Sequence, residues 1–286
     1  MQVLDESTWR VRATAHEVRV DALVAEHLGR RRDGAAHPVH DFLFTYYSFR
    51  PAQLRRWHPG WGVAMEGAAE YAELKGYTRR GGVVAVSEEH VATQRSLVEQ
   101  THALLSAAAG RAPQFGCFGL HEWAMVHRAT ESGAGTRHDW PLRLGGAGTD
   151  QVVESHRIVC SHFDAFRFFT ESARPLNTLQ PGRDDRPAYE QPACLHGNMD
   201  LYKHAFRLTP MVPAELVADC FELARDIRVL DMRASPYDLA GLGLDPVRIE
   251  TPEGKQQYAA AQRGFADRAR PLRGRLVAEC ARLLAG

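Results

Sequence analysis

The stretch CLHGNMDLYKHAF, residues 194–206, carries the side chains best suited to chemistry. On a helix, His196, Asp200 and His204 lie four apart on one face, with Lys203 beside them. Asp200 can act as a general base or stabilise a positive charge, and Lys203 can pair with it or bind a substrate. The same face also offers imidazole and carboxylate ligands to zinc or iron, through His196, Asp200 and His204. A solvated face with ordinary ion pairs is the alternative.

A second histidine and acid pair occurs in FGLHEWAMVHR, where His121 precedes Glu122. The stretch is not a zincin motif, because H-E-x-x-H requires histidine at position 125 and this chain has Met125 there. Apolar neighbours surround Glu122, and partial burial would raise the pKa of its carboxyl and suit acid–base catalysis. An ordinary helix surface is the alternative. We therefore name His121 and Glu122 as candidate catalytic residues, together with Asp200 and Lys203.

Aromatic and basic residues alternate through residues 37–61, HPVHDFLFTYYSFRPAQLRRWHPGW. Such a mixture is what a surface that stacks bases and holds phosphates requires. The aromatic side chains can equally fill a core, with the arginines on the surface. The candidate substrate-binding residues are Tyr46, Tyr47, Arg55, Arg56, Trp57 and Trp61.

Further along the chain, LDMRASPYDL ends an amphipathic pattern, and there we expect Asp231 and Arg233 to form a structural ion pair. The sequence contains no P-loop motif, no G-x-G-x-x-G after a strand and no G-x-S-x-G. These absences argue against nucleotide-binding folds of those types and against an α/β-hydrolase.

The elements that must position these residues are mainly helices. Apolar spacing predicts helices from Ala15 to Arg32, from Pro38 and from Pro51. Ser87 is expected to be the N-cap of a long helix that follows it to about Ala109. Further helices are expected over residues 194–206, from Pro213, and from Lys255 onward. Only residues 81–86, GGVVAV, suggest a strand. We expect a mainly α fold, with residues 1–286 forming a single compact multi-helix domain, a small β element at most, and any subdivision near the Gly-rich residues 129–150.

The composition fits a globular protein in a reducing compartment. Lys and Arg equal Asp and Glu at 35 each, so the zero net charge argues against strong non-specific binding to nucleic acid. The five cysteines are widely spaced without a C-x-x-C pair, which disfavours a disulfide framework. No apolar run approaches the roughly 20 residues of a membrane span. We expect a cytoplasmic protein with no membrane partner, and the oligomeric state stays open.

Four stretches carry a resemblance to a known group: HPVHDFLFTYYSFRPAQLRRWHPGWG, LHEWAMVHR, CLHGNMDLYKHAF and DMRASPYDL. In these, and along most of its length, the chain resembles a bacterial, largely actinobacterial, family that is commonly labelled 3-methyladenine DNA glycosylase. The chain lacks the L-P-G-hydrophobic-G hairpin that helix–hairpin–helix glycosylases carry.

The resemblance implies a DNA-repair hydrolase without a cofactor. Its partner is DNA or another nucleobase-containing substrate, and it cleaves the N-glycosidic bond of an alkylated purine that has been flipped out of the stack. A carboxylate, Asp200 or Glu122, would stabilise the charge that grows on the sugar. The rival hypothesis is a helical metalloenzyme with zinc or iron, acting on a small molecule or nucleoside. Both hypotheses require histidines and acids that are distant in the chain to meet in one cleft.

Overall fold

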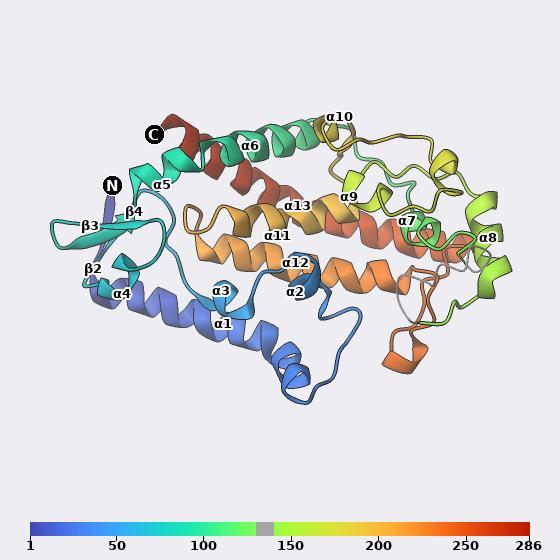
Figure 1. Ribbon diagram of the computed structural model, residues 1–286, viewed down its shortest axis with the longest axis horizontal. Coiled ribbons are helices and arrows are strands. Elements are labelled where there is room, and N and C mark those ends of the chain that lie inside the picture. The colour runs from blue at the N-terminus through green and yellow to red at the C-terminus, as the bar shows by residue number, and fades with distance from the viewer. Residues whose placement is uncertain (130–139) are drawn as a thin grey trace. The chain divides into compact units, whose positions relative to one another are not determined.

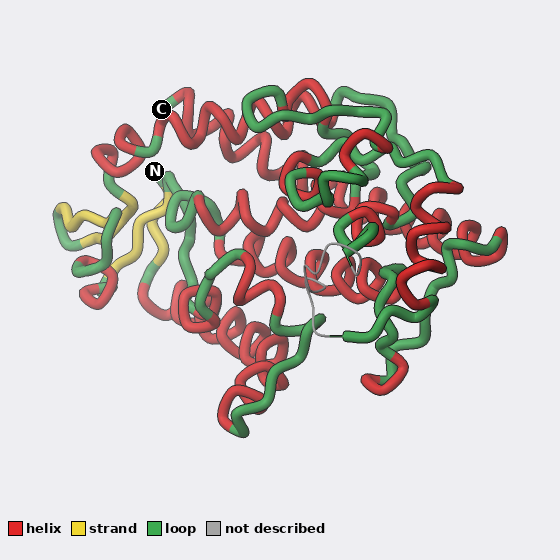
Figure 2. Tube along the Cα trace, turned by 45° about the vertical axis from the view of Figure 1, so that its right-hand side comes forward, coloured by secondary structure: helices red, strands yellow, loops and turns green. Residues whose placement is uncertain are grey.

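The computed structural model describes residues 1–129 and 140–286 (Figure 1). Helices hold 58% of the residues and strands 7%, which confirms the prediction of a mainly α protein with a small β element. Figure 2 shows the strands gathered in one place, with helices and loops making up the remainder. Within the two described ranges, no helix combines the length and apolar character that crossing a bilayer demands.

The chain divides into two compact units. Unit 1 consists of residues 1–106, 200–224 and 271–286, and unit 2 consists of residues 107–199 and 225–270. The single-domain organisation and the possible subdivision near residues 129–150 stay predictions. Residues 130–139 of that glycine-rich segment lie outside the described residues.

Unit 1 begins with strand β1 (Gln2–Leu4) and the long helix α1 (Glu6–Arg32). The Asp5 carboxylate caps α1 by accepting a hydrogen bond from the Thr8 amide at 2.8 Å. Hydrogen bonds from Ser7 and Thr8 lower the pKa of Asp5 to about 2. The helix starts nine residues before the expected Ala15, because its first turns are polar and bury few side chains.

A small mixed sheet completes this part of unit 1. Its strands are β1, β2 (Val63–Glu66), β4 (Val83–Val86) and β3 (Tyr77–Arg80), in that order across the sheet. β1 pairs with β2 in parallel, whereas β4 pairs with β2 and β3 antiparallel. Gly81 and Gly82 have φ of +55° and +87°, so they form the tight turn of the β3–β4 hairpin. The GGVVAV stretch thus supplies a turn and one strand.

Four short helices also belong to unit 1, and the longer α6 begins there. They are α2 (Phe42–Tyr46), α3 (Pro51–Arg55), α4 (Ala69–Ala72), α5 (Glu88–Thr93) and α6 (Arg95–Ala109). The helix expected from Pro38 is only the five-residue α2, and the long helix expected after Ser87 is divided into α5 and α6 at Gln94. Ser87 is the expected N-cap, since its hydroxyl accepts a hydrogen bond from the His90 amide at 3.1 Å.

Unit 2 holds the short helices α7 (Leu120–Ala124), α8 (Gly145–Ser155), α9 (Phe163–Phe166) and α10 (Arg186–Tyr189). Three further helices, like the end of α6, contribute residues to both units: α11 (Leu195–Arg207), α12 (Ala214–Arg233) and α13 (Pro252–Ala285). They begin close to the starts predicted from the sequence. Pro271 lies inside α13, which continues to Ala285.

Two glycines of α13 provide a matched test of packing in unit 2. A Cβ atom at Gly254 would lie 1.8 Å from the carbonyl oxygen of Arg248, whereas one at Gly264 would meet nothing within 4 Å. We expect Gly254→Ala to lower the free energy of unfolding by about 1–3 kcal/mol, as overpacking does. Gly264→Ala should raise it by roughly 0.5–1 kcal/mol, because alanine favours a helix interior. Urea denaturation measures both. Equal effects of the two substitutions would contradict this packing.

Candidate functional site

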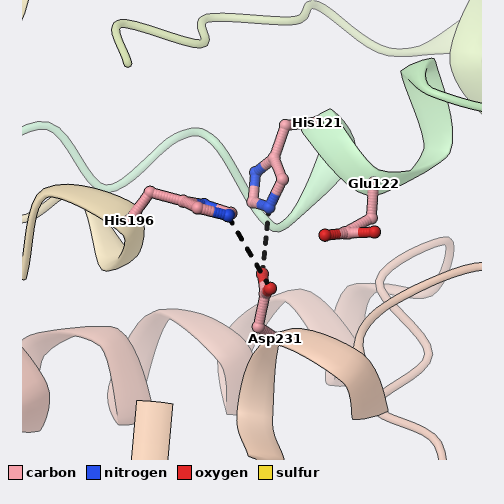
Figure 3. Close-up of side chains that lie close together, drawn as sticks. All are labelled: His121, Glu122, His196 and Asp231. Carbon is pink, nitrogen blue, oxygen red and sulfur yellow. Dashed lines mark hydrogen bonds and ion pairs between the residues drawn. The ribbon is translucent and has the colours of Figure 1, made fainter. Parts of the chain in front are cut away.

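Four potential ligand residues meet inside unit 2 (Figure 3). They are His121 and Glu122 of α7, His196 of α11 and Asp231 of α12, and their ligand atoms all lie within 4.8 Å of one another. The side chains of His121, Glu122 and Asp231 are almost fully buried, and that of His196 is 14% exposed. Buried charges of this kind require partners, so the cluster depends on how its members compensate one another.

A strained turn places the two α7 residues. Phe118 and Gly119 both have positive φ, at 48° and 73°, and α7 begins directly after them. A Cβ at Gly119 would approach Tyr258 to 3.3 Å, so glycine satisfies both the backbone conformation and the packing. The Trp123 indole then donates a hydrogen bond to the Ala234 carbonyl oxygen at 2.8 Å, which ties α7 to the segment after α12.

Asp231 is placed by the apolar stripe of α12. Cys220, Ile227 and Asp231 follow one another at helical spacing, and each is completely buried. A carboxylate on such a stripe is carried into the interior by its apolar neighbours. His196 is placed by the first turn of α11, whose start is fixed where the Gly197 amide donates to the Cys194 sulfur at 3.4 Å.

Hydrogen bonds at Asp231 hold the cluster together. Its Oδ1 accepts from His121 Nε2 at 2.9 Å, and its Oδ2 accepts from the Arg228 guanidinium at 2.9 Å. The same guanidinium nitrogen lies 3.4 Å from Glu122 Oε1. His196 Nε2 lies 4.0 Å from Asp231 Oδ2, which is too long for a hydrogen bond. Arg228 therefore orients both carboxylates, while His196 approaches without being bonded to Asp231.

The two histidines of the cluster have pKa values that are shifted in opposite directions. Burial alone would lower the pKa of His121, but the charge and hydrogen bond of Asp231 raise it well above 6.5. Burial and the neighbouring His121 hold the pKa of His196 well below 6.5. Burial alone would raise the pKa of Asp231, but the charge and hydrogen bond of His121 and the charge of the Arg228 guanidinium lower it. At neutral pH, His121 and Asp231 form a charged pair, and His196 is neutral and able to bind a metal.

A small cavity of about 10 Å³ adjoins the cluster. That volume is close to the space one water molecule needs. His121 and His196 both line it, and so does Gln262, whose buried Oε1 has no hydrogen-bond partner among the described residues. The remaining lining is Cys117, Val159, Cys160, Ser161, His162, Gln191, Cys194, Leu195 and Tyr258.

The donor set fits a transition-metal ion. Ligand atoms about 2.0–2.1 Å from a tetrahedral zinc ion lie roughly 3.3 Å apart, which falls within the separations in this cluster. Ligating histidines usually hydrogen-bond through their second ring nitrogen, and His121 Nδ1 has Cys117 Sγ at 3.5 Å. Arg228 would then serve as the outer partner of both carboxylates.

The other candidate catalytic residues belong to unit 1. Asp200 is buried there; its Oδ1 accepts a hydrogen bond from the Tyr47 hydroxyl at 2.9 Å, and Lys203 forms an ion pair with its Oδ2. His204 is also buried, with 5% of its surface exposed. The polar face of α11 is therefore enclosed by protein. The set His196, Asp200 and His204 divides between unit 2 and unit 1.

The candidate substrate-binding residues, all in unit 1, differ in their exposure. Trp57 is buried, stacked on Trp9 with ring centroids 6.5 Å apart, and it donates a hydrogen bond to Glu215 at 2.9 Å. Trp57 thus offers no open face to a base in this structure. Tyr46 and Trp61 are half-buried.

The two neighbouring arginines have different surroundings. Arg55 is engaged by Glu17 and Asp21, at 3.0 and 2.7 Å. Arg56 is exposed and forms no ion pair with any residue in the described ranges. Of the two arginines predicted to bind phosphate, Arg55 is neutralised by acids and Arg56 is available.

The predicted ion pair between Asp231 and Arg233 is wrong. Asp231 pairs with Arg228 and His121, while Arg233 donates to the Asp245 carbonyl oxygen at 2.8 Å. The reason is helix geometry: Arg228 lies three residues before Asp231 on the same face, and Arg233 does not. The position of Asp231 on the apolar stripe was the signal that could have identified it as a buried site residue.

No protein-family model matches this chain, and neither the curated proteins nor the solved structures contain a match to it.

The charged pair of His121 and Asp231 predicts a pH-dependent stability for the metal-free protein. The raised pKa of His121 gives stabilisation that is complete below about pH 6.5 and is lost as pH rises through the folded-state pKa. The lowered pKa of Asp231 gives stabilisation that is present above about pH 3.8 and is lost on acidification. His121→Gln should lower the free energy of unfolding by about 3–5 kcal/mol near pH 6, and by less near pH 9.

Urea titrations at a series of pH values measure that difference. His156→Gln is the matched control, because among the described residues the His156 ring, in the same unit, has only Ser155 and the Val152 carbonyl oxygen as hydrogen-bond partners. If His121→Gln lowered the free energy of unfolding more at pH 9 than at pH 6, the result would contradict the assigned charges.

Proposed function

We propose that the protein is a metal-dependent hydrolase whose centre is the cluster of His121, Glu122, His196 and Asp231. The observation that carries the proposal is the convergence of four potential ligands, from three separate helices, within 4.8 Å in a buried site. Zinc or iron suits a set of two imidazoles and two carboxylates. Its substrate class is a small molecule or nucleoside with a hydrolysable bond.

The surroundings of the cluster support hydrolysis. A bound ion would act as a Lewis acid toward a water or substrate oxygen. The adjoining cavity has the volume of about one water molecule and is lined by both histidines. Gln262 Oε1, buried at its edge, can accept a hydrogen bond from such a water. His196, neutral at pH 7, binds without first losing a proton.

The charge balance indicates how metal and proton compete. Without metal, Asp231 and Glu122 face Arg228 and protonated His121, so opposite charges are equal in number. His121 would have to give up the proton that it now donates to Asp231 in order to hold a metal. Binding is therefore expected to release a proton and to weaken as pH falls.

Metal analysis tests the proposed centre. After removal of metal by a chelator, reloading and gel filtration, we expect about one zinc or iron ion per chain. His196→Ala should weaken binding by more than the roughly 10–100-fold that outer-shell changes produce. The His196 side chain is the most exposed of the four ligands, so this substitution is the least harmful to folding.

His156→Ala serves as the control histidine and should leave the metal content unchanged. Cobalt replacement adds a spectroscopic readout. Cobalt bound by nitrogen and oxygen ligands of the protein absorbs visible light more strongly than the hydrated cobalt ion does. Substoichiometric metal in wild type, or equal binding by His196→Ala and wild type, would overturn the proposal.

A metal-free glycosylase is the second candidate, as the family resemblance implies. The observation that favours it is Asp200, a buried carboxylate held by the Tyr47 hydroxyl and the Lys203 ammonium. Such a carboxylate can stabilise the positive charge that develops on a sugar during cleavage of the glycosidic bond. Lys203 can meet the abasic product. DNA, DNA repair and an alkylated purine belong to this proposal.

Release of 3-methyladenine from methylated DNA distinguishes the two candidates. The glycosylase proposal predicts release that is unaffected by a chelator and falls at least about 100-fold in Asp200→Asn, by analogy with the removal of one charge-stabilising group. The metal proposal predicts that any base or nucleoside hydrolysis disappears with the metal and returns on reloading. Absence of base release from chelator-treated and metal-loaded protein alike would reject the glycosylase.

A cytoplasmic location completes the proposal. It is supported by the state of the cysteines, since all five are free thiols. Unpaired cysteines are typical of reducing compartments.

A further inference from the structure

A second site is suggested by a basic pocket in unit 1. The pocket has a volume of about 510 Å³, within the range of small-molecule sites. None of the described residues that line it is acidic. The lining consists of Ser48, Phe49, Gln53, Arg56, His58, Leu74, Lys75, His90, Gln94, Phe206, Arg207, Thr209 and Pro210.

Three cations in this lining stand without a carboxylate. Arg56, Lys75 and Arg207 are exposed, and none forms an ion pair within the described ranges. Two arginines elsewhere in unit 1 are neutralised: Arg55, beside Arg56, contacts two acids, and Arg19 contacts Asp219 and a second acid. The pocket therefore concentrates uncompensated positive charge, and this charge is the complement of an anion.

Two histidines add neutral hydrogen-bonding groups. Burial and the nearby Arg56 lower the pKa of His58 to about 3, and its Nδ1 lies 2.9 Å from the Tyr77 hydroxyl. Burial and Lys75 lower the pKa of His90 as well. Both rings are uncharged at neutral pH, so the positive charge of the pocket comes from Arg56, Lys75 and Arg207.

An apolar wall completes the pocket. Phe49 and Phe206 stack with ring centroids 4.2 Å apart and an angle of 21° between their planes. Both rings line the same space as the cations. An anion-binding region next to an aromatic wall suits an organic molecule with a charged group at one end, and a bare inorganic ion would leave the wall unused.

We propose that this pocket binds a small phosphorylated organic molecule, whose phosphate is held by Arg56, Lys75 and Arg207. A phosphomonoester carries nearly two negative charges at neutral pH and presents three acceptor oxygens. The guanidinium groups donate paired hydrogen bonds to such oxygens, and the Lys75 ammonium supplies a point charge. The organic part lies against Phe49 and Phe206. The site uses no residue of the metal cluster.

The arrangement favours a compact ligand over a nucleic-acid strand. A strand requires cations spread along its phosphates, with successive aromatic platforms between them. Here three cations line one pocket with a single aromatic pair, and the net charge of the chain is zero. Such a pocket matches one terminal phosphate or diphosphate.

Calorimetric titration with adenosine monophosphate, pyrophosphate and inorganic phosphate tests the site. We expect adenosine monophosphate and pyrophosphate to bind, and inorganic phosphate to bind more weakly than the nucleotide. Arg56→Gln and Arg207→Gln should each weaken nucleotide binding by about tenfold or more, as loss of one charge-assisted hydrogen bond does. Both side chains are exposed, so both variants should unfold at the wild-type urea concentration.

Arg79→Gln is the matched control, because Arg79 is an exposed cation of β3 in the same unit and does not line the pocket. It should bind the nucleotide as wild type does. Equal weakening in Arg79→Gln, or no binding of the nucleotide or of pyrophosphate at millimolar concentration, would overturn the proposal. So would affinity that rises steadily with the length of a single-stranded oligonucleotide. Metal content should be unchanged in Arg56→Gln, Arg207→Gln and Arg79→Gln. A failure of nucleotide binding can then be told apart from a failure of the proposed metal centre.

Discussion

Burial of the Asp231 carboxylate is the constraint on which the centre of unit 2 depends. The apolar stripe of α12 carries this side chain to a position with no exposed surface. An uncompensated charge there would destabilise the fold strongly, so Arg228 and His121 must be held at hydrogen-bonding distance. That requirement explains the strained turn at Phe118 and Gly119, which directs the first residues of α7 toward α12. It also explains the raised pKa of His121.

The same compensation makes the cluster suitable for a metal. His121 and Arg228 balance the negative charges of two carboxylates. A divalent ion bound there would supply the positive charge that protonated His121 supplies in the metal-free protein. The neutral His196 lies 4.0 Å from Asp231 Oδ2 without a hydrogen bond to it, so it would give up no bond to Asp231 if it served as a ligand. The features that stabilise the metal-free fold would therefore also preorganise the ligands of the proposed centre.

Much of the fold is predictable from the sequence. The helical spacing of apolar residues locates the starts of α11, α12 and α13, and Ser87 identifies the start of α5 correctly. The strands β1, β2 and β3 are three or four residues long, too short for alternation to be recognised. The start of α1 lies in a polar stretch where Trp9 is the one large buried side chain of the first turns. Its packing depends on Trp57, which is distant in the sequence.

The site is predictable only in part. Residue type and an apolar neighbourhood indicate His121, Glu122 and His196, but the sequence contains no rule that brings α7 to the end of α12. Asp231 was therefore assigned to Arg233, and Asp200 was grouped with His196 because they are one helical turn apart. In the structure Asp200 interacts with Tyr47 in unit 1, across 153 positions of sequence. Side-chain spacing on one helix describes a face, and only tertiary packing decides which partners meet there.

X-ray absorption at the metal edge of the reloaded protein tests the central claim most directly. Our account predicts a first shell of nitrogen and oxygen only, at about 2.0–2.2 Å, with the scattering pattern of two imidazoles. A sulfur shell at about 2.3 Å would place the ion on Cys117, Cys160 or Cys194 instead. Either that result, or a shell of water oxygens without imidazole, would contradict a centre built on His121, Glu122, His196 and Asp231.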